Sequence, residues 1–296
     1  MLCSYCKKHV AIKNSHLIPK FVYRWLVGTS ATGKIRETSN PNRRAQDGLK
    51  LEMLCKDCEG AFSKFERIFK QDIFDNFTAG TPRKNELELN AVHRKCILSI
   101  AWRVLCNKIL HDENDDPQLF ESDYLLMQKY ADLIKKDIEG EGKVDCSIHI
   151  VPCIPSVINK CLYSNVDMSL YERCTNFNVQ VFGDEGEVEK LTCYIKIPFL
   201  IIVTEFIDLS SKGWSGTNIE DKINFDEVSG VPQYVLQVLA DQYNAFLAGA
   251  EQLTPRQKTI LEQEAAKLDG TSGSEETFER NFLLEGNVKK IPWVKS

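Results

Sequence analysis

Cys3-Ser4-Tyr5-Cys6 and Leu54-Cys55-Lys56-Asp57-Cys58-Glu59 are two Cys-x2-Cys motifs, and 48 residues separate one from the other. Each motif can present two thiolates from one tight turn, and four thiolates form the tetrahedral sulfur site that structural zinc prefers. Redox activity or coincidence would also explain paired cysteines, but the spacing favours metal. We therefore expect Cys3, Cys6, Cys55 and Cys58 to bind one zinc ion, which would stabilise a region with little core of its own.

The other seven of the eleven cysteines are single residues in apolar surroundings, typical of small buried side chains. An odd number of cysteines without a secretion signal argues against a disulfide framework. The N-terminus lacks the apolar segment of a signal peptide, and no apolar run reaches the 18 residues of a membrane-spanning helix. We expect a cytoplasmic protein that does not contact a membrane.

Charge is unevenly distributed along the chain. The net charge is −5, but the first 50 residues carry ten Lys or Arg and two acidic side chains, against 27 basic and 40 acidic residues in the remainder. A basic N-terminal part on an acidic body is typical of a phosphate-contacting module carried by another domain. Basic residues clustered in solvated loops would give the same count, so the asymmetry only favours a nucleic-acid partner.

Hydrophobic periodicity predicts an α+β protein of two domains. Residues 1–80 form a zinc module, with a short helix at Pro19–Leu26, a long loop at Gly28–Gly48 and a helix from Leu54 to Phe77. Residues 81–296 form a mixed helical and antiparallel β domain. Within it we expect helices over 85–138, strands over 143–207, helices over 232–268 and a flexible tail over 270–296.

Further motifs lie between and beside the cysteine pairs. Ser15-His16-Leu17-Ile18-Pro19-Lys20 begins nine residues after Cys6, Asn40-Pro41-Asn42-Arg43-Arg44 follows, and Glu59 comes directly after the last motif cysteine. With these motifs, residues 1–75 resemble the HNH endonuclease family, a group of treble-clef, ββα-metal zinc modules. The resemblance does not extend to the remaining residues.

The resemblance implies metal-dependent hydrolysis of DNA phosphodiester bonds, in which a histidine activates water and a divalent cation stabilises charge on the phosphate. His16 would be the general base, and Glu59 a ligand of Mg²⁺ or Mn²⁺ in place of the usual histidine. Asn42 would orient the loop beside the base, with Asn40 and Asp47 as alternatives. Glu66 lies seven residues after Glu59, on the same face of the predicted helix, and is a second candidate ligand.

The family resemblance also implies DNA as partner. As charge-assisted donors, Lys20, Arg24, Arg43 and Arg44 are the candidates for phosphate contacts, with solvated loop charges as the alternative interpretation. Many HNH modules in bacterial defence or mobile-element proteins are fused to a second domain, so the resemblance implies a role in restriction or antiphage defence. This sequence departs from the family at Ser15, at Glu59 and in the asparagine spacing. Two alternatives therefore stay open: a module that binds nucleic acid without cleaving it, or one whose zinc supports a homodimer or a partner protein bound through residues 81–296.

Overall fold

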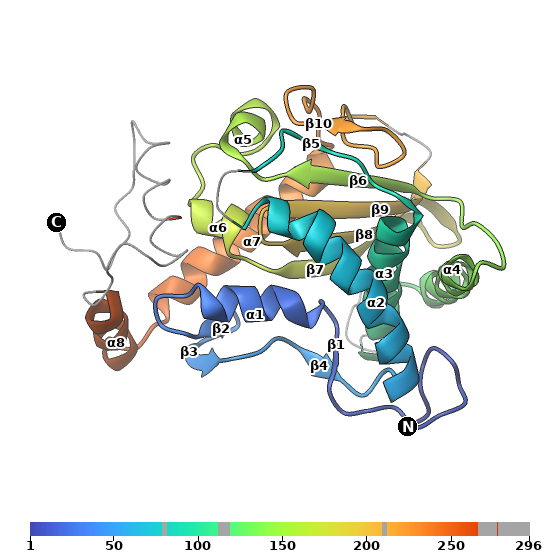
Figure 1. Cartoon of the computed structure of the whole chain (residues 1–296), viewed down its shortest axis with the longest axis horizontal. Coiled ribbons are helices and arrows are strands. Elements are labelled where there is room, and N and C mark those ends of the chain that lie inside the picture. The colour runs from blue at the N-terminus through green and yellow to red at the C-terminus, as the bar shows by residue number, and fades with distance from the viewer. Residues whose placement is uncertain (79–81, 112–118, 209–211, 266–276, 278–296) are drawn as a thin grey trace.

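The computed structural model spans the chain and describes residues 1–78, 82–111, 119–208, 212–265 and Thr277 (Figure 1). Its N-terminal part consists of β1 (Ser15–His16), α1 (Lys20–Gly28), β2 (Ile35–Glu37), β3 (Asn40–Ala45), β4 (Lys50–Leu51), α2 (Lys56–Asp72) and the 3-10 turn η1 (Phe74–Asn76). Strands β1 and β4 pair antiparallel, with Ser15 opposite Leu51 and His16 opposite Lys50. The chain then enters α2, so the expected ββα order is present.

The remainder of the described chain is a mixture of helices and antiparallel strands. In order these are β5 (Glu86–Leu87), α3 (Ala91–His111), α4 (Glu121–Glu139), β6 (Ser147–Pro152), α5 (Pro155–Cys161), α6 (Met168–Glu172), β7 (Asn176–Asp184), β8 (Glu187–Ile197), β9 (Leu200–Asp208), β10 (Ile223–Asn224), α7 (Gln233–Glu251) and α8 (Pro255–Ala265). The α+β class predicted from the sequence is confirmed. No helix in the described part of the chain is long and apolar enough to cross a membrane.

One four-stranded antiparallel sheet organises the body, in the order β6-β9-β8-β7. Strands β7 and β8 form a hairpin, and its turn uses Gly186 at φ +79°, a conformation that a residue without a Cβ adopts at little cost. Residues 191–197 of β8 and 200–206 of β9 are buried, which explains why these parts of the two strands are mostly apolar. Helix α3 packs on this sheet, and α2 lies in front of it in Figure 1.

Local chemistry accounts for the ends of the long helices. Asn90 begins α3, because its side-chain oxygen accepts hydrogen bonds from the N–H groups of Val92 and His93 at 2.9 and 3.1 Å. Helix α4 ends at Gly140, which has φ +81°. Helix α2 begins at Cys55 and carries acidic residues in its first turn and Lys70 in its last turn, an order that complements the helix dipole.

Buried apolar side chains form one continuous cluster that includes both predicted domains. Tyr5 from the first cysteine turn packs edge-on against Phe62 of α2 and Trp102 of α3, with ring centroids 5.0 and 5.1 Å apart. Trp25 of α1 likewise contacts Phe199 at the β8–β9 turn, at 5.3 Å. The N-terminal part is thus packed directly on the body, while a division into domains near residue 80 stays a prediction.

Two predicted regions contain other secondary structure than expected, and a third lies almost entirely outside the described residues. The predicted loop Gly28–Gly48 contains the β2–β3 hairpin, and the predicted strand region 143–207 includes helices α5 and α6. The hairpin depends on distant contacts, because the Asn42 amide donates to Gln252 O and its oxygen accepts from Thr254 N–H, at 3.0 and 2.8 Å. A local pattern cannot reveal such support. The predicted tail 270–296 lies outside the described residues except for Thr277.

Candidate functional site

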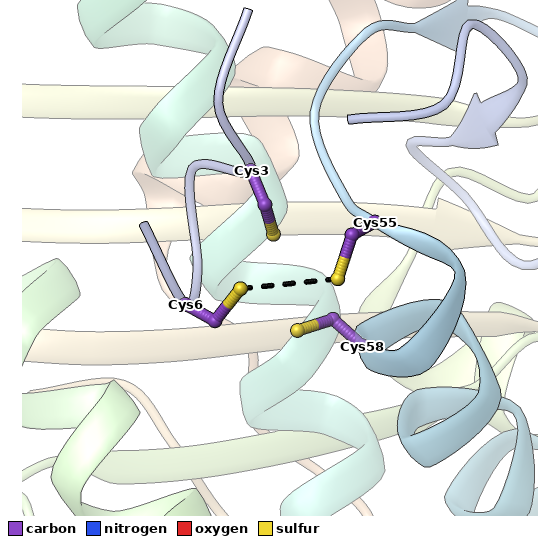
Figure 2. A group of neighbouring side chains, drawn as sticks. All are labelled: Cys3, Cys6, Cys55 and Cys58. Atoms are coloured by element: carbon purple, nitrogen blue, oxygen red, sulfur yellow. Dashed lines mark hydrogen bonds between the residues drawn. The ribbon is translucent and has the colours of Figure 1, made fainter. Parts of the chain in front are cut away.

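The four motif cysteines converge at the N-terminal end of α2 (Figure 2). Their sulfur atoms all lie within 4.8 Å of one another, and Cys6 Sγ is 3.8 Å from Cys55 Sγ. Zinc–sulfur bonds of about 2.3 Å in a tetrahedron separate the sulfurs by about 3.8 Å. This cluster can therefore hold a zinc ion, as the sequence predicted.

Backbone hydrogen bonds join the two cysteine turns. Cys3 N–H donates to His9 O at 2.8 Å, and Lys7, at φ +56°, lets the chain turn back after Cys6. Ser4 N–H donates to Met53 O at 2.8 Å, which links the first turn to the segment before Cys55. The ends of the 48-residue insert are thus held together by protein contacts as well as by any bound ion.

The four thiols differ in acidity because their surroundings differ. Hydrogen bonds from the backbone N–H groups of Lys8 and His9 lower the pKa of Cys6 to about 6. Burial, followed by the neighbouring thiols, raises the pKa of Cys58 above its ordinary value. Four thiols this close cannot all ionise without a compensating cation, and a divalent ion supplies that charge. The chemistry of the donor set therefore suits zinc.

A cavity of about 490 Å³ lies beside the cysteine cluster, between α1 and α2. His16 lines it together with Glu59, Ser63 and Glu66 of α2. Six cationic side chains also line the cavity, namely Lys20, Arg24, Lys50, Arg67, Lys70 and Arg103. The structure thus brings the predicted residues His16, Glu59, Glu66, Lys20 and Arg24 to one cavity.

His16 is held by a carboxylate. Its Nε2 lies 2.8 Å from Asp47 Oδ1, and Asp47 Oδ2 accepts from Lys50 Nζ at 2.8 Å. Burial raises the pKa of Asp47, but hydrogen bonds from Lys50 and His16 outweigh it and place the pKa below its ordinary value. Because an ionised carboxylate only accepts, Nε2–H donates to it, and the lone pair stays on Nδ1. Asp47, one of the alternatives to Asn42, is thus the residue that contacts the histidine.

Close packing sets the path of the chain at this carboxylate. Gly48 donates its N–H to Asp47 Oδ1 at 3.0 Å and lies directly against the ring of Tyr23 in α1. A Cβ at this glycine would lie 1.8 Å from Tyr23 Cζ, so no larger residue fits without movement. The Tyr23 ring of α1 and the loop that carries Asp47 therefore lie as close to each other as the backbone allows.

The two predicted carboxylate ligands differ in their contacts. Glu66 Oε1 accepts a hydrogen bond from Arg103 Nη2 at 2.6 Å. Glu59 Oε1 is buried and, within the described part of the chain, has no hydrogen-bond partner. A buried carboxylate oxygen left unpaired costs free energy unless a cation or a donor reaches it. Glu59 is therefore the side chain of this cavity that is free to bind a cation.

The cations of the cavity also fall into two groups. Lys50, Lys70 and Arg103 pair with the carboxylates of Asp47, Asp75 and Glu66. For Lys20, Arg24 and Arg67, no ion pair with a carboxylate occurs among the residues that the structure describes. Lys20 and Arg24 are exposed on α1 and Arg67 on α2, so these three cations are available to an anion.

Three predicted residues lie elsewhere. Asn42, Arg43 and Arg44 belong to β3 and do not line the cavity. Asn42 binds the α7–α8 connection instead, whereas Arg43 and Arg44 are exposed on the hairpin. Arg44 stands opposite Arg36 across the hairpin, and the guanidinium of Arg36 donates to Pro41 O and to Gln257 Oε1 at 2.9 Å. The predicted basic residues thus divide between the cavity and a separate hairpin.

Lys50, Arg67 and Arg103 also line the cavity, although they were not among the residues predicted from the sequence. Arg67 follows Glu59 and Ser63 at spacings of four residues in α2. Helical periodicity could therefore have placed it on the same helix face as these two residues. Arg103 is a lone charge in the apolar segment Ile97–Leu105, and a charge in that setting usually has a buried partner. Lys50 had no such signal, because its place in the cavity beside His16 follows from the pairing of β4 with β1.

Searches against protein-family models, curated proteins and solved structures find no match for this chain. Function is therefore inferred from the residues of the site themselves.

Proposed function

We propose that this protein is a metal-dependent endonuclease of the HNH type that hydrolyses DNA phosphodiester bonds. One observation carries the proposal. A histidine held by a carboxylate, a carboxylate oxygen without a partner and three cations without carboxylate partners all line the same cavity beside the cysteine cluster. Phosphodiester hydrolysis needs these three kinds of group: a base, a cation ligand and donors for phosphate oxygens.

In this proposal, His16 Nδ1 takes the proton of the water that attacks phosphorus. A P–O bond forms to that water, the P–O bond to the leaving oxygen breaks, and solvent returns a proton to the leaving oxygen. Asp47 stabilises the imidazolium formed on His16. Lys20, Arg24 and Arg67 hold the phosphate oxygens.

Zinc, held by the four cysteines, is proposed as the structural ion, and Mg²⁺ or Mn²⁺ as the catalytic ion. Glu59 would hold the catalytic ion, which would act as a Lewis acid when bound. In the described chain, the groups of three or more metal-ligating side chains are the four cysteines and the set His9, Cys55 and Asp57. The cavity thus offers one free carboxylate rather than a complete cage, which suits Mg²⁺, an ion that keeps waters and uses substrate phosphates as ligands.

The test is nicking of supercoiled plasmid in Mg²⁺ or Mn²⁺. We expect His16→Ala to lower the rate by about 10²–10⁴-fold, the usual contribution of a general base. We expect Asp47→Asn to lower it by about 10–100-fold, with zinc content unchanged. Asp72→Asn is the matched control, because Asp72 Oδ2 holds His93 Nε2 at 3.1 Å outside the cavity. Absence of nicking with either cation, or equal nicking by His16→Ala, would exclude the proposal.

A second candidate is a module that binds nucleic acid without cleaving it. Neither of the two groups of metal-ligating side chains found among the described residues lines the cavity, and this favours the second candidate. It predicts that plasmid and RNA bind in a salt-dependent manner while His16→Ala leaves binding unchanged. Binding by a protein that never nicks would select this candidate.

A further inference from the structure

Arg103 links the candidate site to the body of the protein. It lies on α3, outside the segment that resembles a nuclease module, and only 1% of its surface is exposed. Its Nη1 donates to the backbone oxygen of His16 at 2.8 Å, and its Nη2 donates to Glu66 Oε1 at 2.6 Å. Its Nε donates to Ser99 O at 3.1 Å, so the guanidinium plane is fixed along its own helix.

These contacts have two consequences for the cavity. The strand that carries His16 is held from the α3 side by Arg103, while Asp47 holds the imidazole itself. The buried guanidinium also requires a counter-charge, and Glu66 supplies it. A carboxylate oxygen engaged at 2.6 Å with a buried arginine is a poor ligand for a further cation. The unpaired oxygen of Glu59 then remains for that cation.

We propose that Arg103 is a positioning residue for the candidate site: it fixes the backbone of His16 and withholds Glu66 from the catalytic cation. This inference rests on the proposed function and deepens it, because it makes α3 a necessary part of the site. The zinc module alone then lacks one of the contacts that set its geometry. It also assigns the two carboxylates of α2 to different tasks, Glu59 to the cation and Glu66 to the arginine.

The chain offers a matched control on the same helix. Arg94 is also buried on α3, and its Nη2 lies 3.2 Å from Asp137 Oδ2, away from the cavity. The experiment compares Arg103→Gln, Arg103→Lys and Arg94→Gln in the full-length, zinc-loaded protein. It measures Mn²⁺ affinity by electron paramagnetic resonance, nicking kinetics, and the imidazole resonances of His16 by NMR without Mn²⁺.

Opposite effects on binding and turnover distinguish positioning from a loss of folding. In Arg103→Gln we expect Mn²⁺ to bind about threefold tighter or more, because Glu66 is released and ligand charge raises affinity. We expect kcat to fall by about tenfold or more, with KM little changed, and the His16 resonances to move. Arg103→Lys keeps the positive charge beside Glu66. For this variant we expect the Mn²⁺ affinity of the wild-type protein and a kcat between those of Arg103→Gln and the wild-type protein. Arg94→Gln should change neither the Mn²⁺ affinity, nor the nicking kinetics, nor the His16 resonances.

Unchanged His16 resonances in Arg103→Gln, or equal changes in Arg94→Gln, would overturn the inference, as would weaker Mn²⁺ binding. If the wild-type protein neither nicks DNA nor binds Mn²⁺, the proposed function fails, but the His16 resonances still decide whether Arg103 positions this residue. Should Arg103→Gln not fold, Arg103→Lys and Glu66→Gln serve in its place. Both should move the His16 resonances, and neither should tighten Mn²⁺ binding.

Discussion

Asp47 Oδ1 lies 2.8 Å from His16 Nε2, although 31 positions along the chain separate the two residues. The antiparallel pairing of β1 with β4 brings them together, because His16 stands opposite Lys50 and the turn before β4 carries Asp47. The same turn lies against Tyr23, which leaves room there only for Gly48. A backbone arrangement of a few residues thus creates the histidine–carboxylate pair.

This pair makes stability depend on pH. The pKa of Asp47 lies below its ordinary value in the folded protein, and an unfolded aspartate titrates near about 3.9. The stabilisation is therefore complete above about pH 4 and is lost as the pH falls through the folded pKa. We expect Asp47→Asn to lower the melting temperature at pH 7, and the difference from wild type to shrink below about pH 4. Both proteins carry the same four cysteines, so loss of metal in acid affects them alike. A difference that stays constant with pH would contradict the prediction.

Zinc content tests the cysteine cluster. We expect about one zinc per chain by elemental analysis, and its loss in Cys55→Ser, because three thiolates and a hydroxyl bind zinc far more weakly. Loss of a structural ion should lower the melting temperature by about 10 °C or more. Cys161→Ser is the control, since Cys161 lies in α5 outside the cluster. Metal-free wild-type protein, or equal zinc in both variants, would remove the basis for the zinc module.

Salt dependence tests the three cations without carboxylate partners. Each phosphate contact that is lost should reduce the slope of log affinity against log salt by about 0.9 for duplex DNA and about 0.7 for a single strand. We expect this reduction for Lys20→Met, Arg24→Met and Arg67→Met, measured by fluorescence anisotropy on the His16→Ala background. Lys129→Met changes an exposed lysine of α4 outside the cavity and should leave the slope unchanged. Equal slopes in all four variants would argue that no nucleic acid binds between α1 and α2.

Two glycines provide a matched test of packing. In Gly48→Ala the new methyl group would overlap the Tyr23 ring, and we expect a loss of about 1–3 kcal/mol in the free energy of unfolding. The nicking rate should fall as well, because the Asp47 loop must move. Gly28 ends α1, and a methyl group added there would meet no atom within 4 Å, so Gly28→Ala should be nearly neutral or slightly stabilising. Denaturant unfolding of both variants measures the difference, and equal stabilities would show that the Tyr23 contact is unimportant.

Features that depend on a strong local sequence pattern could be predicted from the sequence. Hydrophobic periodicity predicted α2, and it predicted strands within residues 143–207, where β6, β7 and β8 lie. The cysteine spacing predicted a cluster, and the structure brings all four sulfurs together. The β2–β3 hairpin had no comparable signal, since Arg36 is held by α8 and Asn42 by the segment between α7 and α8.

Residue types and their spacing were enough to establish an α+β protein with four cysteines that can hold zinc and with a histidine between them. Periodicity and ligand chemistry act over a few residues, so these features can be read from the amino acids alone. Only the tertiary structure decided that Asp47 contacts His16, that Arg103 takes up Glu66, and that Glu59 remains unpaired among the described residues. Those contacts form where strand pairing and helix packing bring distant side chains within hydrogen-bonding distance. A local sequence pattern does not specify which of several similar carboxylates will contact the histidine or the arginine.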